Sequence, residues 1–159
     1  MNIYLNKKNF YIFILFYSLL AIFFALYIEY ILGYKPCKLC LYQRIPYILS
    51  TIICFFGYFF YSNKIFIYLL IFAFLSSLFI SGYHLGIENN IFTEFSGCTN
   101  ENLNTTNKTE LLESLNNYMP NCKSVSFRIL GLSLATINFI LSIALTLITI
   151  TYLYYEKNR

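Results

Sequence analysis

The sequence contains few charged residues. Asp, Glu, Lys and Arg make up 11% of its 159 positions, whereas 58% of the positions are hydrophobic. Soluble globular domains carry about 25% charged residues, so this composition excludes an ordinary soluble domain. We therefore expect a membrane protein that is surrounded by a lipid bilayer.

Histidine is also scarce, since the chain has only one His. It has five Cys residues. Structural zinc sites usually need two closely spaced pairs of Cys or His. Only one such pair, Cys37-x-x-Cys40, is present. We therefore expect no metal site.

Four apolar runs cover residues 10–32, 45–61, 65–85 and 129–152. A membrane span needs about 20 apolar residues, and a helix satisfies its own backbone hydrogen bonds in lipid. The first run is longer than the apolar region of a secretory signal, and no small-x-small cleavage pattern follows it. The sequence predicts a single all-α membrane domain over residues 1–159, a bundle of four transmembrane helices.

The connections between these runs differ in length. Residues 62–64 form a tight hairpin, whereas the other two connections cover about 33–44 and 86–128. With four spans, the two longer loops lie on one face, and the hairpin and both termini lie on the other. Four cysteines therefore share the loop face: Cys37, Cys40, Cys98 and Cys122.

The basic residues do not decide which face is cytoplasmic. Five Lys and Arg residues fall on the terminal face and six on the loop face, so the positive-inside rule finds no clear excess. Paired loop cysteines favour an oxidising compartment, which places the loops outside and both termini in the cytoplasm. The net charge of +4 is spread over both faces and indicates no nucleic-acid partner.

The remaining features are local. Leu111, Leu112 and Leu115 share one side of a short amphipathic helix that we predict within residues 108–117 of the long loop. Cys54 falls among Phe and Ile inside the second run, as a small buried hydrophobic residue does.

The Cys37-x-x-Cys40 pair is the main candidate for chemistry. Cationic neighbours and a helix N-terminus both lower a thiol pKa, and Arg44 lies four residues after Cys40. Pro46 leaves two possibilities, a helix that starts at Pro46 or a kinked helical turn before it. A two-residue gap between cysteines is more typical of reversible redox centres than of structural disulfides. Arg44 also has the alternative role of an interfacial anchor.

Several motifs resemble the DsbB family of disulfide-generating membrane proteins. Residues 36–47 read Pro-Cys-Lys-Leu-Cys-Leu-Tyr-Gln-Arg-Ile-Pro-Tyr, and residues 83–88 read Tyr-His-Leu-Gly-Ile-Glu. Pro-Asn-Cys at 120–122 and Leu-Gly-Leu-Ser-Leu-Ala at 130–135, followed by Asn138, complete the match in family order. The chain has no Trp, and Phe92, Phe127 and Ile137 stand where relatives often carry one.

The resemblance implies a relay of disulfides in the bacterial inner membrane, with periplasmic loops. A soluble DsbA-like oxidase with a thioredoxin fold would attack the Cys98–Cys122 disulfide at Cys98. Cys122 would then exchange with Cys37, which leaves Cys40 as a thiolate facing a membrane quinone, either ubiquinone or menaquinone.

The same resemblance implies residues around the quinone. Arg44 matches the family's quinone-site arginine. Two further candidates come from the residues themselves. Glu29 and His84 lie near the same membrane boundary, where they either assist proton transfer or are interfacial polar groups with satisfied hydrogen bonds.

Two other functions are compatible with four helices and two cysteine pairs. One is a vitamin K epoxide reductase-like enzyme, but in that family the quinone-facing Cys-x-x-Cys follows the loop pair, in the opposite order. The other is a non-enzymatic membrane protein whose disulfides brace its loops.

Overall fold

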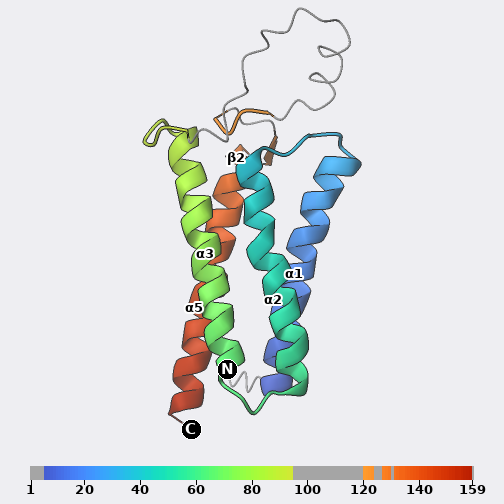
Figure 1. Ribbon diagram of the computed structural model, residues 1–159, viewed down its shortest axis with the longest axis vertical. Helices are drawn as coiled ribbons and strands as arrows, with labels where there is room; N and C mark the ends of the chain where they lie inside the picture. The colour runs from blue at the N-terminus through green and yellow to red at the C-terminus, as the bar shows by residue number, and fades with distance from the viewer. Residues whose placement is uncertain (1–5, 95–119, 124–126, 130, 159) are drawn as a thin grey trace, which may run out of the picture.

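The computed structural model describes residues 6–94, 120–123, 127–129 and 131–158. Four long helices run side by side, which confirms the predicted all-α bundle (Figure 1). They are α1 (Lys7–Tyr30), α2 (Lys38–Phe59), α3 (Ile65–Glu88) and α5 (Leu134–Lys157). At about 1.5 Å per residue each helix is long enough to cross a hydrocarbon core of about 30 Å. All four are also apolar enough to do so.

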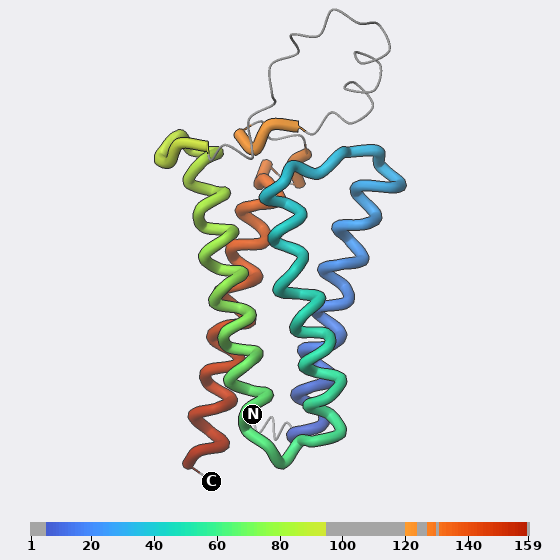
Figure 2. The backbone as a smooth tube through the Cα atoms, viewed as in Figure 1, coloured from blue at the N-terminus to red at the C-terminus, as the bar shows by residue number. Residues whose placement is uncertain are grey.

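The helices pack in the order α1, α2, α3, α5, with contacts between each neighbouring pair. Both described ends of the chain and the short connection between α2 and α3 lie at one end of the bundle, and the described parts of the other two connections lie at the opposite end (Figure 2). We call these the terminal end and the loop end. Cys37 and Cys122 share a buried cluster at the loop end, packed against Cys40. Cys98 and the predicted helix at 108–117 lie outside the described residues.

Helix α2 begins at Lys38, seven residues before the apolar run that predicted it. Cys37 caps this helix, because its sulfur accepts a hydrogen bond from the Cys40 backbone N–H at 3.3 Å. Pro46 lies inside the helix. Of the two possibilities left by the sequence, a helical turn therefore precedes the proline. As a result, Cys40 and Arg44 lie on the first two turns of α2.

Helix α5 begins five residues later than its apolar run. The strands β1 (Arg128–Ile129) and β2 (Leu132–Ser133) pair antiparallel in front of it. Gly131 connects them with φ of +84°, a conformation that only glycine adopts without strain. The Ser133 hydroxyl then accepts a hydrogen bond from the Thr136 backbone N–H and caps the helix.

The packed core fills the terminal end of the bundle. It joins the start of α1 and α3 to the second half of α2 and α5, with Phe10, Leu70, Phe74 and Leu145 among its most buried side chains. Cys54 belongs to this core as a free thiol that is 1% exposed, which confirms its interpretation as a buried hydrophobic residue. Toward the loop end, a cavity lies between α1, α2 and α5.

Candidate redox centre and its cavity

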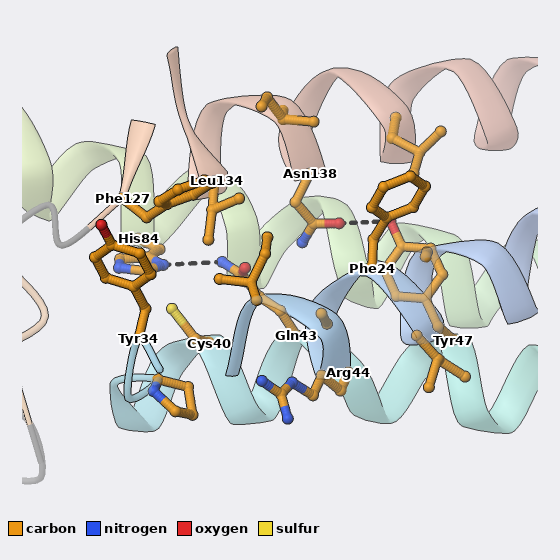
Figure 3. Close-up of a pocket in the computed structure, with 18 of the residues that line it drawn as sticks. Phe24, Tyr34, Cys40, Gln43, Arg44, Tyr47, His84, Phe127, Leu134 and Asn138 are labelled. Atoms are coloured by element: carbon orange, nitrogen blue, oxygen red, sulfur yellow. Dashed lines mark hydrogen bonds between the residues drawn. The ribbon is translucent and has the colours of Figure 1, made fainter. Parts of the chain in front are cut away.

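One face of α2 lines the cavity. Cys40, Gln43, Arg44 and Tyr47 follow the i, i+3, i+4, i+7 spacing of a single helical face, and all four border a space of about 570 Å³ (Figure 3). Most of the other lining residues are apolar or aromatic. Those from α1 and α5 include Phe24, Ile28, Leu134, Ile137 and Leu141, and Tyr34 and Phe127 come from the connections.

Cys37 and Cys40 are free thiols whose sulfur atoms lie 3.0 Å apart. A disulfide bond has a length of about 2.05 Å, so the two sulfurs need only a small movement to form one when the pair loses two electrons and two protons to an acceptor such as a quinone. The pKa of Cys37 is lowered from 9.0 to about 4. The hydrogen bond from the Cys40 thiol is the largest cause, followed by burial, which opposes it, and by contacts with His84. In the reduced pair, Cys37 is the sulfur that is stabilised as a thiolate.

His84 is buried between the two cysteine-bearing segments. Its Nε2 lies 3.7 Å from the Cys37 sulfur and 3.2 Å from the backbone carbonyl oxygen of Cys122. Gln43 Nε2 lies 3.0 Å from His84 Nδ1. Because an amide nitrogen only donates, Nδ1 accepts this bond, and Nε2 of the neutral ring carries the proton. His84 therefore donates toward Cys37 and Cys122.

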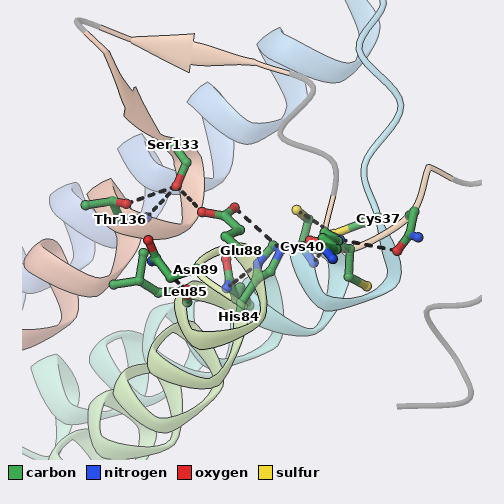
Figure 4. A network of polar contacts seen from close by, with 12 residues as sticks. Cys37, Cys40, His84, Leu85, Glu88, Asn89, Ser133 and Thr136 are labelled. Carbon is green, nitrogen blue, oxygen red and sulfur yellow. Dashed lines mark hydrogen bonds and ion pairs between the residues drawn. The ribbon is translucent and has the colours of Figure 1, made fainter. Parts of the chain in front are cut away.

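A chain of polar contacts continues from His84 to the start of α5 (Figure 4). Glu88 Oε1 lies 3.8 Å from His84 Nε2, one helical turn along α3. The other carboxylate oxygen accepts a hydrogen bond from the Ser133 hydroxyl at 2.5 Å, and Ser133 also caps α5. Glu88 thus links the redox pair to the helix that closes the far side of the cavity.

Cys122 forms a disulfide and is 2% exposed. It is buried in the same cluster as Cys37, Leu39 and Ile87. A disulfide sulfur and the capping thiol of α2 therefore belong to a single packed unit at the loop end.

Arg44 and Glu29 form an ion pair across α1 and α2, with side chains that are 17% and 22% exposed. Arg44 lines the cavity, as a quinone-site residue should, whereas Glu29 is not among the residues that border it. The charge of Arg44 is paired with this carboxylate. The low pKa of Cys37 comes from Cys40 and His84, and not from the arginine on which the sequence argument relied.

The ligating atoms of Cys37, Cys40 and His84 all lie within 4.8 Å of one another. With both thiols deprotonated, this set could hold a thiophilic ion such as Zn²⁺. The sequence did not indicate this grouping, because His84 is 44 residues from Cys40. The same sulfur atoms cannot bind a metal and form a disulfide at once, so the two chemistries exclude each other.

Comparison with known families distinguishes between these chemistries. The model of the family described as disulfide bond formation protein DsbB matches residues 7–152. The chain belongs to the DsbB family. It is also 28% identical over 148 residues to the uncharacterized protein RP370 of Rickettsia prowazekii (strain Madrid E), covering 89% of this chain and 85% of that one.

Membership of the DsbB family implies a disulfide-forming oxidoreductase activity in a multi-pass membrane protein. The exposed aromatic side chains on its helices agree with a lipid environment. Phe16, Phe23, Phe72 and Phe79 are each at least 60% exposed in the isolated chain.

The sequence argument gave no role to four polar residues of this DsbB-family site: Gln43, Tyr47, Glu88 and Asn138. Gln43 and Tyr47 share the helical face of Cys40, so their spacing could have indicated them. Asn138 lies on another helix, and only the fold brings it to Tyr47, whose hydroxyl donates to Asn138 Oδ1 at 2.5 Å.

Proposed function

We propose that the protein reoxidises a soluble DsbA-like thiol oxidase and passes the electrons to a membrane quinone. In the net reaction, a partner dithiol becomes a disulfide, and a quinone takes up two electrons and two protons to become a quinol. One observation carries this proposal. The redox pair contacts the disulfide-bonded Cys122 segment on one side and an apolar cavity on the other.

The first step takes place in the long loop. We propose that Cys98 is the disulfide partner of Cys122 and the atom that the reduced oxidase attacks. The chain has five cysteines, Cys122 is disulfide-bonded, and the other three described cysteines are free thiols. Attack at Cys98 breaks the loop disulfide and releases Cys122 as a thiolate.

The second step is disulfide exchange between Cys122 and the Cys37–Cys40 disulfide. A thiolate attacks one sulfur and expels the other, and attack at Cys37 expels Cys40. Cys37 is the proposed target, because it is buried with Cys122 in one cluster and both residues contact His84. The second thiol of the oxidase attacks the mixed disulfide, which releases the oxidised oxidase and frees Cys98 as a thiolate. Attack by Cys98 on the Cys122 sulfur of the new Cys37–Cys122 bond would then restore the loop disulfide and leave the Cys37–Cys40 pair reduced.

The cavity suits a quinone. Its walls are largely apolar, and the aromatic rings of Phe24, Tyr34 and Phe127 border it. Cys40 and Arg44 supply a sulfur and a guanidinium group at its edge. When bound there, a quinone supplies an acceptor for two electrons and two protons. Cys40 is the residue from which the electron pair leaves the chain, and Arg44 holds positive charge beside it.

The orientation in the membrane follows from the same chemistry. A soluble oxidase that makes disulfides works in an oxidising compartment, so the loop end faces the periplasm and both termini face the cytoplasm. The quinone pool is then reached from within the bilayer, along the sides of the helices.

Quinol formation tests this proposal. The purified protein in detergent is mixed with a reduced thioredoxin-fold oxidase and a short-chain quinone, and quinone absorbance is followed. We expect quinol to form with the natural chain and with Cys54→Ser, because Cys54 lies in the core away from the cavity. Cys40→Ser should retain its helical circular dichroism spectrum and form no quinol. If the natural chain forms no quinol, the proposed enzymatic activity is refuted.

A further inference from the structure

Asn138 presents a buried NH₂ group that has no hydrogen-bond partner among the described residues. Its Nδ2 atom is buried and makes no hydrogen bond, one of five such side-chain atoms among the described residues. An unsatisfied buried donor is destabilising, because it has lost the hydrogen bonds that water would supply. Asn138 lines the cavity, where a ligand atom could satisfy this donor (Figure 3).

Tyr47 determines which group of the Asn138 amide is left without a hydrogen bond. Its hydroxyl donates to Asn138 Oδ1 at 2.5 Å, so the amide oxygen is satisfied and the NH₂ group is not. Tyr47 itself is held by Ser142, whose hydroxyl lies 3.3 Å away and in turn contacts Ser77 at 2.8 Å. This polar network spans α2, α3 and α5 and keeps the amide in one orientation.

The position of the pair relative to Cys40 indicates what it binds. Tyr47 follows Cys40 by seven residues on α2, which is about 10 Å along the helix axis. Cys40 therefore lies nearer the loop end of the cavity, and Asn138, beside Tyr47, lies farther from that end (Figure 3). A para-quinone carries its two carbonyl oxygens on opposite sides of the ring, and each of them only accepts hydrogen bonds.

We propose that Asn138 Nδ2 donates a hydrogen bond to the quinone carbonyl that lies farther from Cys40, with Tyr47 as the residue that positions the amide. This inference rests on the proposed quinone reduction. It adds a ligand contact on α5 and an orientation of the ring, with the opposite carbonyl directed toward Cys40.

Asn138→Leu tests the contact. Leucine has a similar volume but no donor, and Tyr47 keeps Ser142 as a partner. Thr151→Val is the matched control, because Thr151 is a polar residue of the same helix whose hydroxyl donates to backbone carbonyls of α5, outside the Tyr47 network, and it does not line the cavity. A short-chain benzoquinone labelled with ¹³C at its carbonyls is titrated onto the oxidised protein in detergent. Its Kd and the infrared band of the bound carbonyl are measured.

In the natural chain and in Thr151→Val, we expect one carbonyl band at the lower frequency of a hydrogen-bonded group. Asn138→Leu should lose this band and raise the Kd about 2- to 13-fold, the range of one net hydrogen bond. If Asn138→Leu does not fold, Tyr47→Phe carries the test, since it releases the amide and should weaken the same band.

The outcomes separate the two proposals. A natural chain that binds quinone, with the same Kd and the same band in the folded variants, would overturn the role of Asn138 and leave quinone reduction intact. A natural chain that binds no quinone would overturn both.

Discussion

The substitution Cys40→Ala removes the neighbour that most lowers the pKa of Cys37. The Cys40 thiol lies 3.0 Å from the Cys37 sulfur and is the largest cause of its pKa of about 4. His84 and the Cys40 backbone N–H remain in the variant, and burial continues to oppose ionisation. We therefore expect the pKa of Cys37 to rise from about 4 toward its ordinary value of 9.0.

The size of this change decides which quantity to measure. At pH 7 a thiol with a pKa of about 4 is almost fully ionised, whereas one with a pKa of about 9 is roughly 1% ionised. The reactivity of a thiolate, however, rises with its pKa with a Brønsted coefficient of about 0.4–0.5. Over a pKa change of about 5, this amounts to about 100- to 300-fold. The two effects nearly cancel, so the alkylation rate at pH 7 changes little, and the midpoint of the pH profile reports the pKa.

The assay is alkylation of the fully reduced protein by iodoacetamide over a range of pH, with the Cys37 peptide quantified by mass spectrometry. Cys54→Ala serves as the control, because it removes a core thiol that does not touch Cys37. The midpoint for Cys37 should lie near pH 4 in the control and several pH units higher in Cys40→Ala. An unchanged midpoint in Cys40→Ala would refute the conclusion that the Cys40 thiol lowers the pKa of Cys37.

Two further predictions concern metal and packing. Treatment with EDTA should leave quinol formation unchanged, because the sulfur atoms act through disulfide exchange; loss of activity that Zn²⁺ restores would make the cysteine–histidine cluster a metal centre instead. Gly57→Ala should lower the thermal unfolding midpoint in detergent more than Gly86→Ala does. A Cβ at Gly57 would lie 2.5 Å from the ring of Tyr11, which is 1% exposed and cannot move away. At Gly86 the crowded ring belongs to Phe92, which is 51% exposed and can swing into solvent. A larger loss of stability in Gly86→Ala would contradict this reasoning.

The bundle was predictable because lipid imposes a simple requirement on the sequence. Four runs of about 20 apolar residues can only be helices in the bilayer, and their parity places the long connections at one end. The helix starts were less predictable, since polar residues decide them. Cys37 caps α2, so this helix begins before its apolar run. The turn at Gly131 precedes α5, so that helix begins only after its cap, Ser133.

The site was predictable only where its residues share a segment. The Cys37–Cys40 pair and Arg44 follow one another in the chain, so the motif indicated them directly. His84 and Asn138 reach the site from other helices, and their partners depend on how those helices pack. The pairing of Arg44 with Glu29 shows the same limit. The low Cys37 pKa comes first from Cys40 and then from a histidine 47 residues away, and not from Arg44.

The most direct test of the relay uses the variant Cys40→Ser. Its disulfides are mapped after the free Cys37 thiol has reacted with the loop disulfide of the same molecule. In this variant Cys37 has no partner within its motif, and the contacts around His84 direct it to Cys122. We predict that acid quenching, alkylation and peptide mass spectrometry will find a Cys37–Cys122 disulfide and an alkylated Cys98. A Cys37–Cys98 disulfide, or a Cys37 that remains a free thiol, would contradict the proposed path of the electrons.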